Sequence, residues 1–406
     1  MSRATMGIQY TQKISPQNMS ELEYSDYDFT EIPFDDIVQV GQRNLLYRDM
    51  FTVSWLLGRF CNYKCSYCWP YARSDTKDHR PTPLMLHTVD EIKRQARERG
   101  FNSFHFSLSG GEPTFHPAYI DILNHLNDDV ANTNYTSVHM TSNMSRPLKW
   151  FETQYVPAVK NFHRASITAS CHREHVDTDK KVDEFADKLV LCQEYDTQIT
   201  INMVMVPEQF NEIYDLSLYF HNRGINVTLK PQSDPTASRV VDGYTPEMLA
   251  KLHNGMPQRA FTEQKALKSG LVKRPKPTFL IDKADPGFKQ QAGVDAHYQV
   301  EFIDKKGEPW FMDQAERFNA FNFNNFNKWE CSSGYRSIII REPDGTVKRS
   351  YSCSEVPLGH IETGFKLYDK PMPCGGTSCV SSADSKIPKR APGTKLPLFP
   401  GDTTFL

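Results

Sequence analysis

The sequence lacks any long apolar run. No segment approaches the length of a transmembrane helix, and the first six residues lack the apolar core of a secretory signal peptide. Lys plus Arg number 47 and Asp plus Glu number 49, so the chain has no charge excess that would attract nucleic acid or an acidic membrane. These absences favour a cytoplasmic protein that acts on a small or locally recognised substrate, with no nucleic-acid or membrane partner.

Cysteine is also scarce. Nine cysteines in 406 residues are too few for a disulfide scaffold, although the chain is long enough for two or three domains. Two cysteines stand alone, Cys171 and Cys192. The other seven fall into two groups toward the two ends of the chain: Cys61, Cys65, Cys68, Cys331, Cys353, Cys374 and Cys379. In a reducing compartment, grouped cysteines indicate metal binding.

The first group has the spacing C-x3-C-x2-C and directly follows an apolar run at residues 51–57. Three thiolates from one short loop can hold three irons of a cubane iron–sulfur cluster and leave the fourth iron open to a small molecule. Zinc fingers and ribbons use two separated Cys/His pairs, the ordinary ferredoxin motif uses four cysteines, and a redox dithiol needs only two. None of these fits the spacing well, but zinc binding and a chance grouping stay open at this point.

An aromatic residue, Tyr67, directly precedes the last cysteine, and with it the loop resembles the signature of the radical S-adenosylmethionine (radical SAM) superfamily. The resemblance implies that Cys61, Cys65 and Cys68 hold a [4Fe-4S] cluster whose open iron binds SAM. It implies that Tyr67 lies near the adenine of SAM. It further implies that SAM is cleaved reductively to a 5′-deoxyadenosyl radical, which abstracts a substrate hydrogen, with an electron donor such as flavodoxin or ferredoxin.

A second motif, Gly110-Gly111-Glu112-Pro113, follows a predicted strand at residues 103–108. The two glycines allow a backbone turn close to a ligand, and the carboxylate of Glu112 can accept a hydrogen bond from an ammonium group. Alone, such a motif is a weak turn signal. One β/α unit after the cysteine loop, it resembles the glycine-rich motif with which radical SAM proteins bind the methionyl amine of SAM.

Weaker matches lie where the family contacts the rest of SAM. They are polar residues on or after the next three predicted strands: Ser142, Asn143, Ser166, Thr168 and Asn202. By the resemblance, hydroxyl groups at these places lie near the ribose and carboxylate of SAM. The alternative is that each is a polar strand residue whose hydrogen bonds are made within the protein.

The pattern of strands and helices predicts an α/β protein. Strands alternate with helices over residues 51–235, which indicates parallel β/α units. The predicted strands are residues 51–57, 103–108, 137–140, 164–169, 198–205 and 226–230, and the predicted helices are residues 88–96, 119–126, 179–194 and 209–222. Six strands favour a partial (β/α)6 barrel of the TIM type, in which ligands bind at the carboxyl ends of the strands.

The remaining segments are distinguished by composition. Residues 1–50 are polar and acidic and predict an extended leader or a short strand-bearing arm packed on the barrel. Residues 236–324 predict a bridging segment with a helix at 245–252 and a hairpin that begins at 297–303. Residues 381–406 predict an irregular tail.

Residues 325–380 contain the second cysteine group. Cys331 precedes a predicted hairpin, Cys353 follows it, and Cys374 and Cys379 lie in a Gly-rich loop, so four thiolates can meet at one point. Four is the full complement of a cubane cluster. This small β-hairpin domain resembles the Twitch appendage of radical SAM enzymes, a shortened relative of the SPASM domain, and so implies a second, auxiliary [4Fe-4S] cluster. The alternatives are zinc, or a cluster with three ligands and an open site for substrate.

The two single cysteines receive different interpretations. Cys192 lies on the apolar side of a predicted helix and is interpreted as a small buried hydrophobic residue. Cys171 begins a polar stretch after the strand at residues 164–169, where a thiol could deliver a hydrogen atom to a substrate radical. Residues 172–175 could grip a polar substrate. The alternative is a polar loop that only caps the next helix.

The predicted function is hydrogen abstraction by a radical SAM enzyme. Two substrate classes fit: a small polar metabolite such as a sugar, aminosugar or cyclitol, oxidised or rearranged, and a ribosomal peptide, cross-linked or epimerised. The lack of a recognisable leader-peptide-binding domain favours the first. Methyl or aminocarboxypropyl transfer from SAM stays open, as does a non-enzymatic iron–sulfur or zinc protein, although the latter needs neither the glycine-rich motif nor the row of β/α units.

Overall fold

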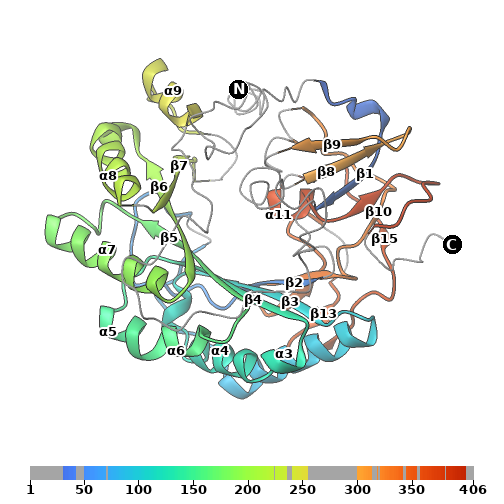
Figure 1. The fold of residues 1–406 in the computed structure, drawn as a ribbon, viewed down its shortest axis with the longest axis horizontal. Coiled ribbons are helices and arrows are strands. Elements are labelled where there is room, and N and C mark those ends of the chain that lie inside the picture. The colour runs from blue at the N-terminus through green and yellow to red at the C-terminus, as the bar shows by residue number, and fades with distance from the viewer. Residues whose placement is uncertain are drawn as a thin grey trace.

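The structure is a computed structural model that describes residues 31–42, 50–69, 72–223, 225–235, 240–254, 300–312, 318, 321–341, 344–353, 357–379 and 381–398. The described residues form two sheets and a layer of helices (Figure 1). Much of the predicted leader and bridging segment, residues 297–299 of the predicted hairpin and residues 399–406 of the tail lie outside the described residues. Among the described helices, none is both long and apolar enough to span a membrane.

The larger sheet has ten strands in the order β14-β13-β12-β11-β2-β3-β4-β5-β6-β7. Strands β2 to β7 pair in parallel in sequence order. They span Phe51–Leu56, Ser103–Ser109, Tyr135–Ser142, Arg164–Cys171, Thr197–Met205 and Asn226–Pro231. The predicted α/β class, the six strands and their parallel order are confirmed, and this curved part of the sheet is called the barrel sheet below.

The barrel sheet is extended by a strand from the C-terminal part of the chain. β11 (Ser337–Ile340) pairs in parallel with β2 on the side away from β3. The sequence places β11 in a hairpin within residues 325–380, and that hairpin forms with β12 (Thr346–Lys348). β13 (Gly359–His360) and β14 (Gly364–Phe365) continue the sheet in antiparallel fashion. β2, which leads into the cysteine loop, is therefore paired on both sides.

Helices cover the outer face of the barrel sheet (Figure 1). They are α3 (Thr82–Glu98), α4 (Tyr119–Asp128), α5 (Leu148–Trp150), α6 (Val156–Val159), α7 (Asp179–Glu194) and α8 (Phe210–Asn222). α3 begins at Thr82 rather than at the predicted residue 88, because Pro83 lies in its first turn, where proline is tolerated. α9 (Pro246–Asn254) confirms the helix predicted in the bridging segment.

Short helical turns lie in the connections between these elements. They are η3 (Phe34–Asp36), η4 (Pro113–Phe115), η5 (Val130–Asn132), η6 (Phe151–Tyr155) and η7 (Pro207–Gln209). η4 directly follows the glycine-rich motif and is capped by the Glu112 side chain, which accepts a hydrogen bond from the Thr114 backbone N–H. The acidic residue of the motif therefore also fixes the turn that comes after it.

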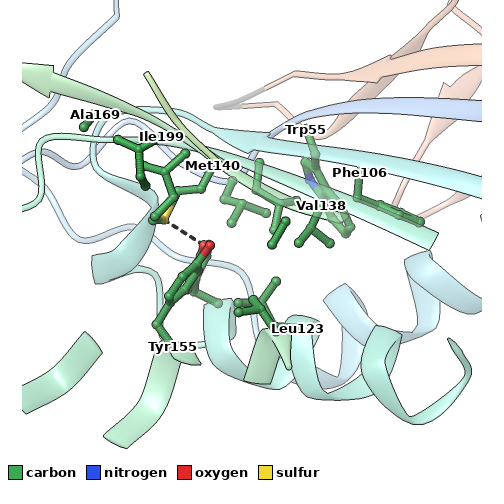
Figure 2. Packing of buried hydrophobic residues seen from close by; sticks show 14 of the residues in the cluster. Trp55, Phe106, Leu123, Val138, Met140, Tyr155, Ala169 and Ile199 are labelled. Carbon is green, nitrogen blue, oxygen red and sulfur yellow. Dashed lines mark hydrogen bonds between the residues drawn. The ribbon is translucent and has the colours of Figure 1, made fainter. Parts of the chain in front are cut away.

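The main hydrophobic core lies between the barrel sheet and the helices. Successive residues of a strand point to opposite faces, and those that point to the helices are apolar. Figure 2 shows such residues from the strands, among them Trp55, Phe106 and Met140, packed toward Leu123 and Tyr155 of the helical layer. The residues between them face the inner side of the sheet.

The smaller sheet has six strands in the order β15-β10-β16-β1-β8-β9 (Figure 1). They are β1 (Ile37–Gln42), β8 (Val300–Asp304), β9 (Pro309–Met312), β10 (Glu330–Cys331), β15 (Met372–Pro373) and β16 (Lys389–Arg390). β8 and β9 form the hairpin predicted in the bridging segment. The sheet thus combines strands from all the predicted segments outside the barrel, and α11 (Ser382–Ser385) precedes β16.

Candidate functional site

The cysteine loop, defined here as residues 58–69, begins just after the carboxyl end of β2. The thiols of Cys61, Cys65 and Cys68 are half-buried. Burial raises the pKa of all three thiols, and that of Cys65 to about 12. Negative charge on Glu174, and then on Cys61 and Cys68, further raises the pKa of Cys65. The loop therefore gathers three thiols at the edge where ligands of parallel sheets bind.

The glycine-rich motif packs against the start of the cysteine loop. Gly111 N–H donates to the Gly58 carbonyl at 2.8 Å, and Glu112 N–H donates to the Phe60 carbonyl at 2.7 Å. A Cβ on Gly110 would lie 2.3 Å from the Gly58 oxygen, and one on Gly111 would lie 2.2 Å from the Phe60 oxygen. The close approach that the glycines permit is therefore made to the backbone of the cysteine loop, so the two motifs are positioned as one unit.

Glu112 is the buried centre of this unit. Its Oε1 accepts hydrogen bonds from the Thr114 hydroxyl at 2.7 Å and the Ser142 hydroxyl at 2.9 Å, and its Oε2 accepts from the Asn143 N–H at 2.7 Å. Burial raises the pKa of Glu112, and these donors partly offset that rise. A buried carboxylate of this kind is stabilised by a cation, and each oxygen can accept more than one hydrogen bond. The site is therefore suited to an ammonium group beside the cysteine loop.

Asn143 connects the end of β4 to the cysteine loop. Its Nδ2 lies 3.8 Å from the Cys61 sulfur and donates to Asn62 Oδ1 at 3.0 Å. The Ser145 hydroxyl donates to the same Asn62 oxygen at 3.2 Å. Ser142 and Asn143, predicted from the family resemblance, thus lie at the cysteine loop and at Glu112. Asn62, Thr114 and Ser145 are contacts that the sequence does not reveal, since nothing in their spacing sets them apart.

The loop after β5 contacts the cysteine loop from the other side. This β5 loop, defined as residues 171–176, contains Glu174, whose Oε2 accepts the Ser66 N–H at 2.8 Å and whose Oε1 accepts the Ser66 hydroxyl. Cys65, Glu174 and His175 each place a ligand atom within 4.8 Å of the other two, and among the described residues they form the single group of this kind. A lone metal ion could therefore also be held here.

The histidines of the β5 loop make further contacts with the cysteine loop. His172 Nδ1 and the Tyr67 hydroxyl are hydrogen-bonded at 2.9 Å. His175 Nε2 accepts the Lys64 N–H at 3.3 Å, and its ring stacks on Tyr63 with centroids 4.0 Å apart. The sequence suggested two roles for residues 172–175, binding of a polar substrate and capping of the next helix. Neither role includes these contacts with the cysteine loop.

The end of the β5 loop is joined to the helical layer. Arg173 pairs with Glu212, and α7 is capped by the Thr178 hydroxyl, which accepts the Lys181 N–H at 3.4 Å.

Cys171 is the last residue of β5 and alternates with Ser170, so it faces the helical core, and its burial raises its pKa to about 12. A thiol in this place does not face the inner side of the sheet. Cys192 is likewise buried in the helical core, as predicted.

The inner face of the barrel sheet is mostly polar. Leu56 near the end of β2 and Val204 near the end of β6 are apolar residues on this face. Its polar side chains include Thr52, Ser54, His105, Ser107, Ser137, His139, Thr141, Arg164, Ser166, Thr168, Ser170, Gln198, Thr200 and Asn202. The predicted SAM-contacting residues Ser166, Thr168 and Asn202 belong to this set. His105 and His139 were not among the predicted site residues, although the alternation of apolar and polar residues in the strands could have indicated both.

Hydrogen bonds organise this inner face. His105 Nδ1 bonds the Ser137 hydroxyl at 2.7 Å, and His139 Nδ1 bonds the Ser166 hydroxyl at 2.9 Å. Burial lowers the pKa of His139 to about 4, and the positive charges of Arg164 and Lys386 lower it further. Both effects also hold the pKa of His105 well below its usual range. The two imidazoles are therefore neutral at neutral pH.

The second cysteine group is gathered from four separate segments. Cys331 lies in β10, Cys353 follows β12, Cys374 follows β15, and Cys379 precedes α11. The Cys374 N–H donates to the Trp329 carbonyl at 2.8 Å, which fixes one of these segments to the β10 strand region. The thiols of Cys331, Cys374 and Cys379 all contact the aromatic core of the smaller sheet.

The thiols of this group interact with one another. A hydrogen bond with the Cys353 thiol lowers the pKa of Cys374 to about 7, and the nearby Arg349 guanidinium contributes in the same direction. Negative charge on Cys331 acts against this lowering, and it also raises the pKa of Cys379. These interactions place Cys353 beside Cys374, and Cys331 near Cys374 and Cys379.

Residues 55–220 match the family model described as "Radical SAM superfamily", and this matched stretch includes the cysteine loop, the glycine-rich motif and the polar inner face of β3 to β6. No curated protein matches the chain. Two solved structures are similar to it, one titled "Native anSMEcpe with bound AdoMet" and the other a histidine-tagged form of the same protein, also with bound AdoMet. Each is 14% identical, has a TM-score of 0.44, and aligns over 78% of this chain and 79% of its own chain.

Proposed function

Because residues 55–220 of this chain are a radical SAM domain, we propose that the protein is a radical SAM enzyme that oxidises or rearranges a small polar metabolite, such as a sugar, aminosugar or cyclitol. The family implies a [4Fe-4S] cluster and SAM as cofactors. When bound, they supply one-electron cleavage of SAM and hydrogen-atom abstraction from the substrate. Enzymes of this family also need a reductant, for which we propose a flavodoxin or ferredoxin.

We assign the cluster to Cys61, Cys65 and Cys68. Three half-buried thiols from one loop match the donor set of a cubane with one open iron. The raised pKa values mean that these thiols release protons when metal binds. The loop is fixed on both sides, by the glycine-rich motif and by the β5 loop, so its sulfurs are held in place before metal arrives.

Glu112 and Tyr67 are assigned to SAM. Glu112 lies next to the cysteine loop, buried and with its pKa raised by that burial, and so it is suited to the amino group of SAM. The Tyr67 hydroxyl is bonded to His172, so the orientation of its ring is fixed beside the thiols, where we propose that it packs on the adenine. Gly110, Gly111 and Pro113 position these groups and do not themselves need to touch SAM.

The observation that supports the substrate class is the polar inner face. A substrate rich in hydroxyl groups meets hydroxyl, amide and imidazole groups there that can both donate and accept. These groups already bond to one another, and a polar substrate can join such a network by exchanging hydrogen bonds, whereas an apolar side chain cannot. The inner face therefore favours a polar metabolite over an apolar peptide side chain.

His139 is suited to orienting such a substrate. Its Nδ1 bonds the Ser166 hydroxyl, and its Nε2 is the second hydrogen-bonding atom of the ring. With a pKa of about 4, the imidazole stays neutral at neutral pH, so its task is to bind and orient a hydroxyl group. Moving a proton would need a pKa nearer the working pH.

We further propose that Cys331, Cys353, Cys374 and Cys379 hold a second [4Fe-4S] cluster. The four cysteines come from separate segments of the chain, and the pKa of Cys374 is lowered by a hydrogen bond with the Cys353 thiol and by Arg349, which favours a thiolate ligand. Burial raises the pKa of Cys379, and the nearby Lys389 partly offsets that rise. A cluster there would supply a one-electron acceptor, which suits a net oxidation of the substrate.

The test combines metal analysis with isotope transfer. Anaerobically purified protein should contain about eight irons and about eight sulfides per chain, as expected for two cubanes. With dithionite and SAM it should form 5′-deoxyadenosine. Deuterated sugars, aminosugars and cyclitols are then supplied in turn, and deuterium in the 5′-deoxyadenosine identifies the substrate. Zinc in place of iron would contradict the proposal, and deuterium transfer from a peptide but from no polyol would contradict the substrate class.

A further inference from the structure

The β5 loop contacts every residue that flanks Cys65. Tyr63, Lys64, Ser66 and Tyr67 are the two residues on each side of that cysteine, and each meets Glu174, His172 or His175. The two loops are far apart in the sequence. We propose that the β5 loop holds the cysteine loop in the conformation that binds the cluster, with Glu174 as the main positioning residue; this rests on the proposed role of the three cysteines as cluster ligands.

Glu174 is the main contact because it holds both polar groups of Ser66. The Ser66 N–H and hydroxyl donate to the two oxygens of one carboxylate, and charge-assisted hydrogen bonds of this kind are about twice as strong as neutral ones. Ser66 lies between the second and third cysteines, within the turn closed by the Cys68 N–H and the Cys65 carbonyl at 3.1 Å. The carboxylate therefore fixes the part of the loop that sets the relative positions of two of the ligands.

The histidine contacts fix the rest of the loop. His175 holds the backbone before Cys65 through Lys64 and stacks on Tyr63, whereas His172 holds Tyr67, next to Cys68. With the flanking residues held in this way, the cysteine side chains are the part of the loop left for iron. Preorganisation of this kind reduces the ordering that must accompany metal binding.

Glu174 also places a negative charge beside Cys65. A carboxylate oxygen of Glu174 lies within 4.8 Å of the Cys65 sulfur. A fixed negative charge beside a cluster ligand disfavours the addition of an electron to the cluster. Removal of the charge should therefore shift the reduction potential to a more positive value, an effect that a merely structural residue would not produce.

The test compares two substitutions of Glu174 with a matched control. Glu174→Ala removes both bonds to Ser66, and Glu174→Gln keeps one acceptor and can donate to the Ser66 hydroxyl. Glu212→Gln is the control, because Glu212 pairs with Arg173 of the same loop at an exposed place rather than with the cysteine loop. For each cluster-free protein, anaerobic cluster uptake, resistance to a chelator and the potential of the cluster by electron paramagnetic resonance are measured.

Glu174→Ala should weaken cluster retention about tenfold or more, the usual effect of losing a residue that orients metal ligands. Glu174→Gln should retain the cluster but at a more positive potential, and Glu212→Gln should match the wild type in both. Should the Ala variant fail to fold, as judged by circular dichroism of the cluster-free protein, Ser66→Ala removes the hydroxyl bond alone and should give a smaller loss.

Three results would overturn the inference. If Glu174→Ala retains the cluster as well as the wild type does, Glu174 does not position the cysteine loop. Retention equal to the wild type in Ser66→Ala, where the Ala variant does not fold, would lead to the same conclusion. An unchanged potential in Glu174→Gln would remove the electrostatic role. A wild-type protein that takes up no iron would instead overturn the proposed function, and this inference with it.

Discussion

The two cysteine groups of this protein differ in what surrounds them. The first group lies between two carboxylates, Glu112 and Glu174, which raise the pKa of Cys61 and Cys65 respectively. In the second group, a hydrogen bond with Cys353 and the cation Arg349 lower the pKa of Cys374 to about 7. Burial raises the pKa of Cys379, where the cation Lys389 has a larger effect than the nearby Asp384. Negative surroundings disfavour an added electron and positive surroundings favour one. A cluster in the second group should therefore be the easier to reduce, which fits its proposed role as acceptor of an electron from the substrate.

Removing a ligand from the first group should have the largest effect. In Cys65→Ala, formation of 5′-deoxyadenosine should be lost, because the open-iron cluster would keep only two thiolate ligands. Iron should fall to about half and the remainder should belong to the second group. The measurement is iron per chain and 5′-deoxyadenosine after reduction. Continued cleavage of SAM by this variant would show that the cysteine loop is not the site of that reaction.

Removing a ligand from the second group should separate the two clusters. Cys353→Ala removes the thiol that lowers the pKa of Cys374, so iron should again fall to about half while SAM cleavage continues. Substrate turnover should decline more than cleavage of SAM. Iron analysis and the ratio of product to 5′-deoxyadenosine test this. Unchanged iron would mean that the second group holds no cluster.

A glycine-to-alanine substitution beside each cysteine group tests how tightly that cysteine group is packed. Gly111→Ala places a Cβ 2.2 Å from the Phe60 carbonyl oxygen, whereas Gly376→Ala places one 3.9 Å from the Cys374 sulfur, an ordinary contact. The first should lower the free energy of unfolding by about 2–4 kcal/mol and displace the cysteine loop. The second should cost less than about 1 kcal/mol. Urea denaturation of both variants makes the comparison, and equal losses would contradict the tighter packing of the first group.

The smallest effect concerns pH. The folded pKa of His139, about 4, lies below the unfolded value of about 6.5, so the unfolded state binds the proton more readily. The stabilising contribution of neutral His139 is complete above the unfolded pKa of about 6.5, and it is lost as the pH falls toward 4. Between pH 7 and 5.5 this residue should account for about 1 kcal/mol of lost stability. His139→Gln should flatten the pH dependence of urea denaturation by that amount, and an unaltered slope would contradict the assigned pKa.

The barrel could be predicted because its signals are local. Alternation of apolar and polar residues marks each strand, and the β/α order allows few arrangements. The cysteine loop and the glycine-rich motif are likewise short and contiguous, so their residue types and spacing could be read directly. The start of α3 was harder to place, because Pro81 and Pro83 resemble breakers although the first turn of a helix tolerates proline.

Contacts between distant segments could not be predicted in this way. Nothing in the sequence indicates that Glu174 meets Ser66, or that β11 pairs with β2, since each is a tertiary contact with no periodic signature. The face to which the Cys171 side chain points follows from the alternation along β5. The sequence alone does not show that this strand continues as far as Cys171. The alternation of apolar and polar residues indicates the polar inner face, but it does not set His105 and His139 apart from the other polar strand residues.

The pairing of β2 with β11 has a consequence for biosynthesis. β2 is made early, yet one of its edges stays uncovered until residue 340 has left the ribosome. An uncovered strand edge can pair with other chains, so the growing chain must pass through a stage at which the base of the cysteine loop is open to misassociation. Iron delivered before that stage ends would meet an incomplete site. The chain order thus favours insertion of the first cluster after translation is finished rather than during it.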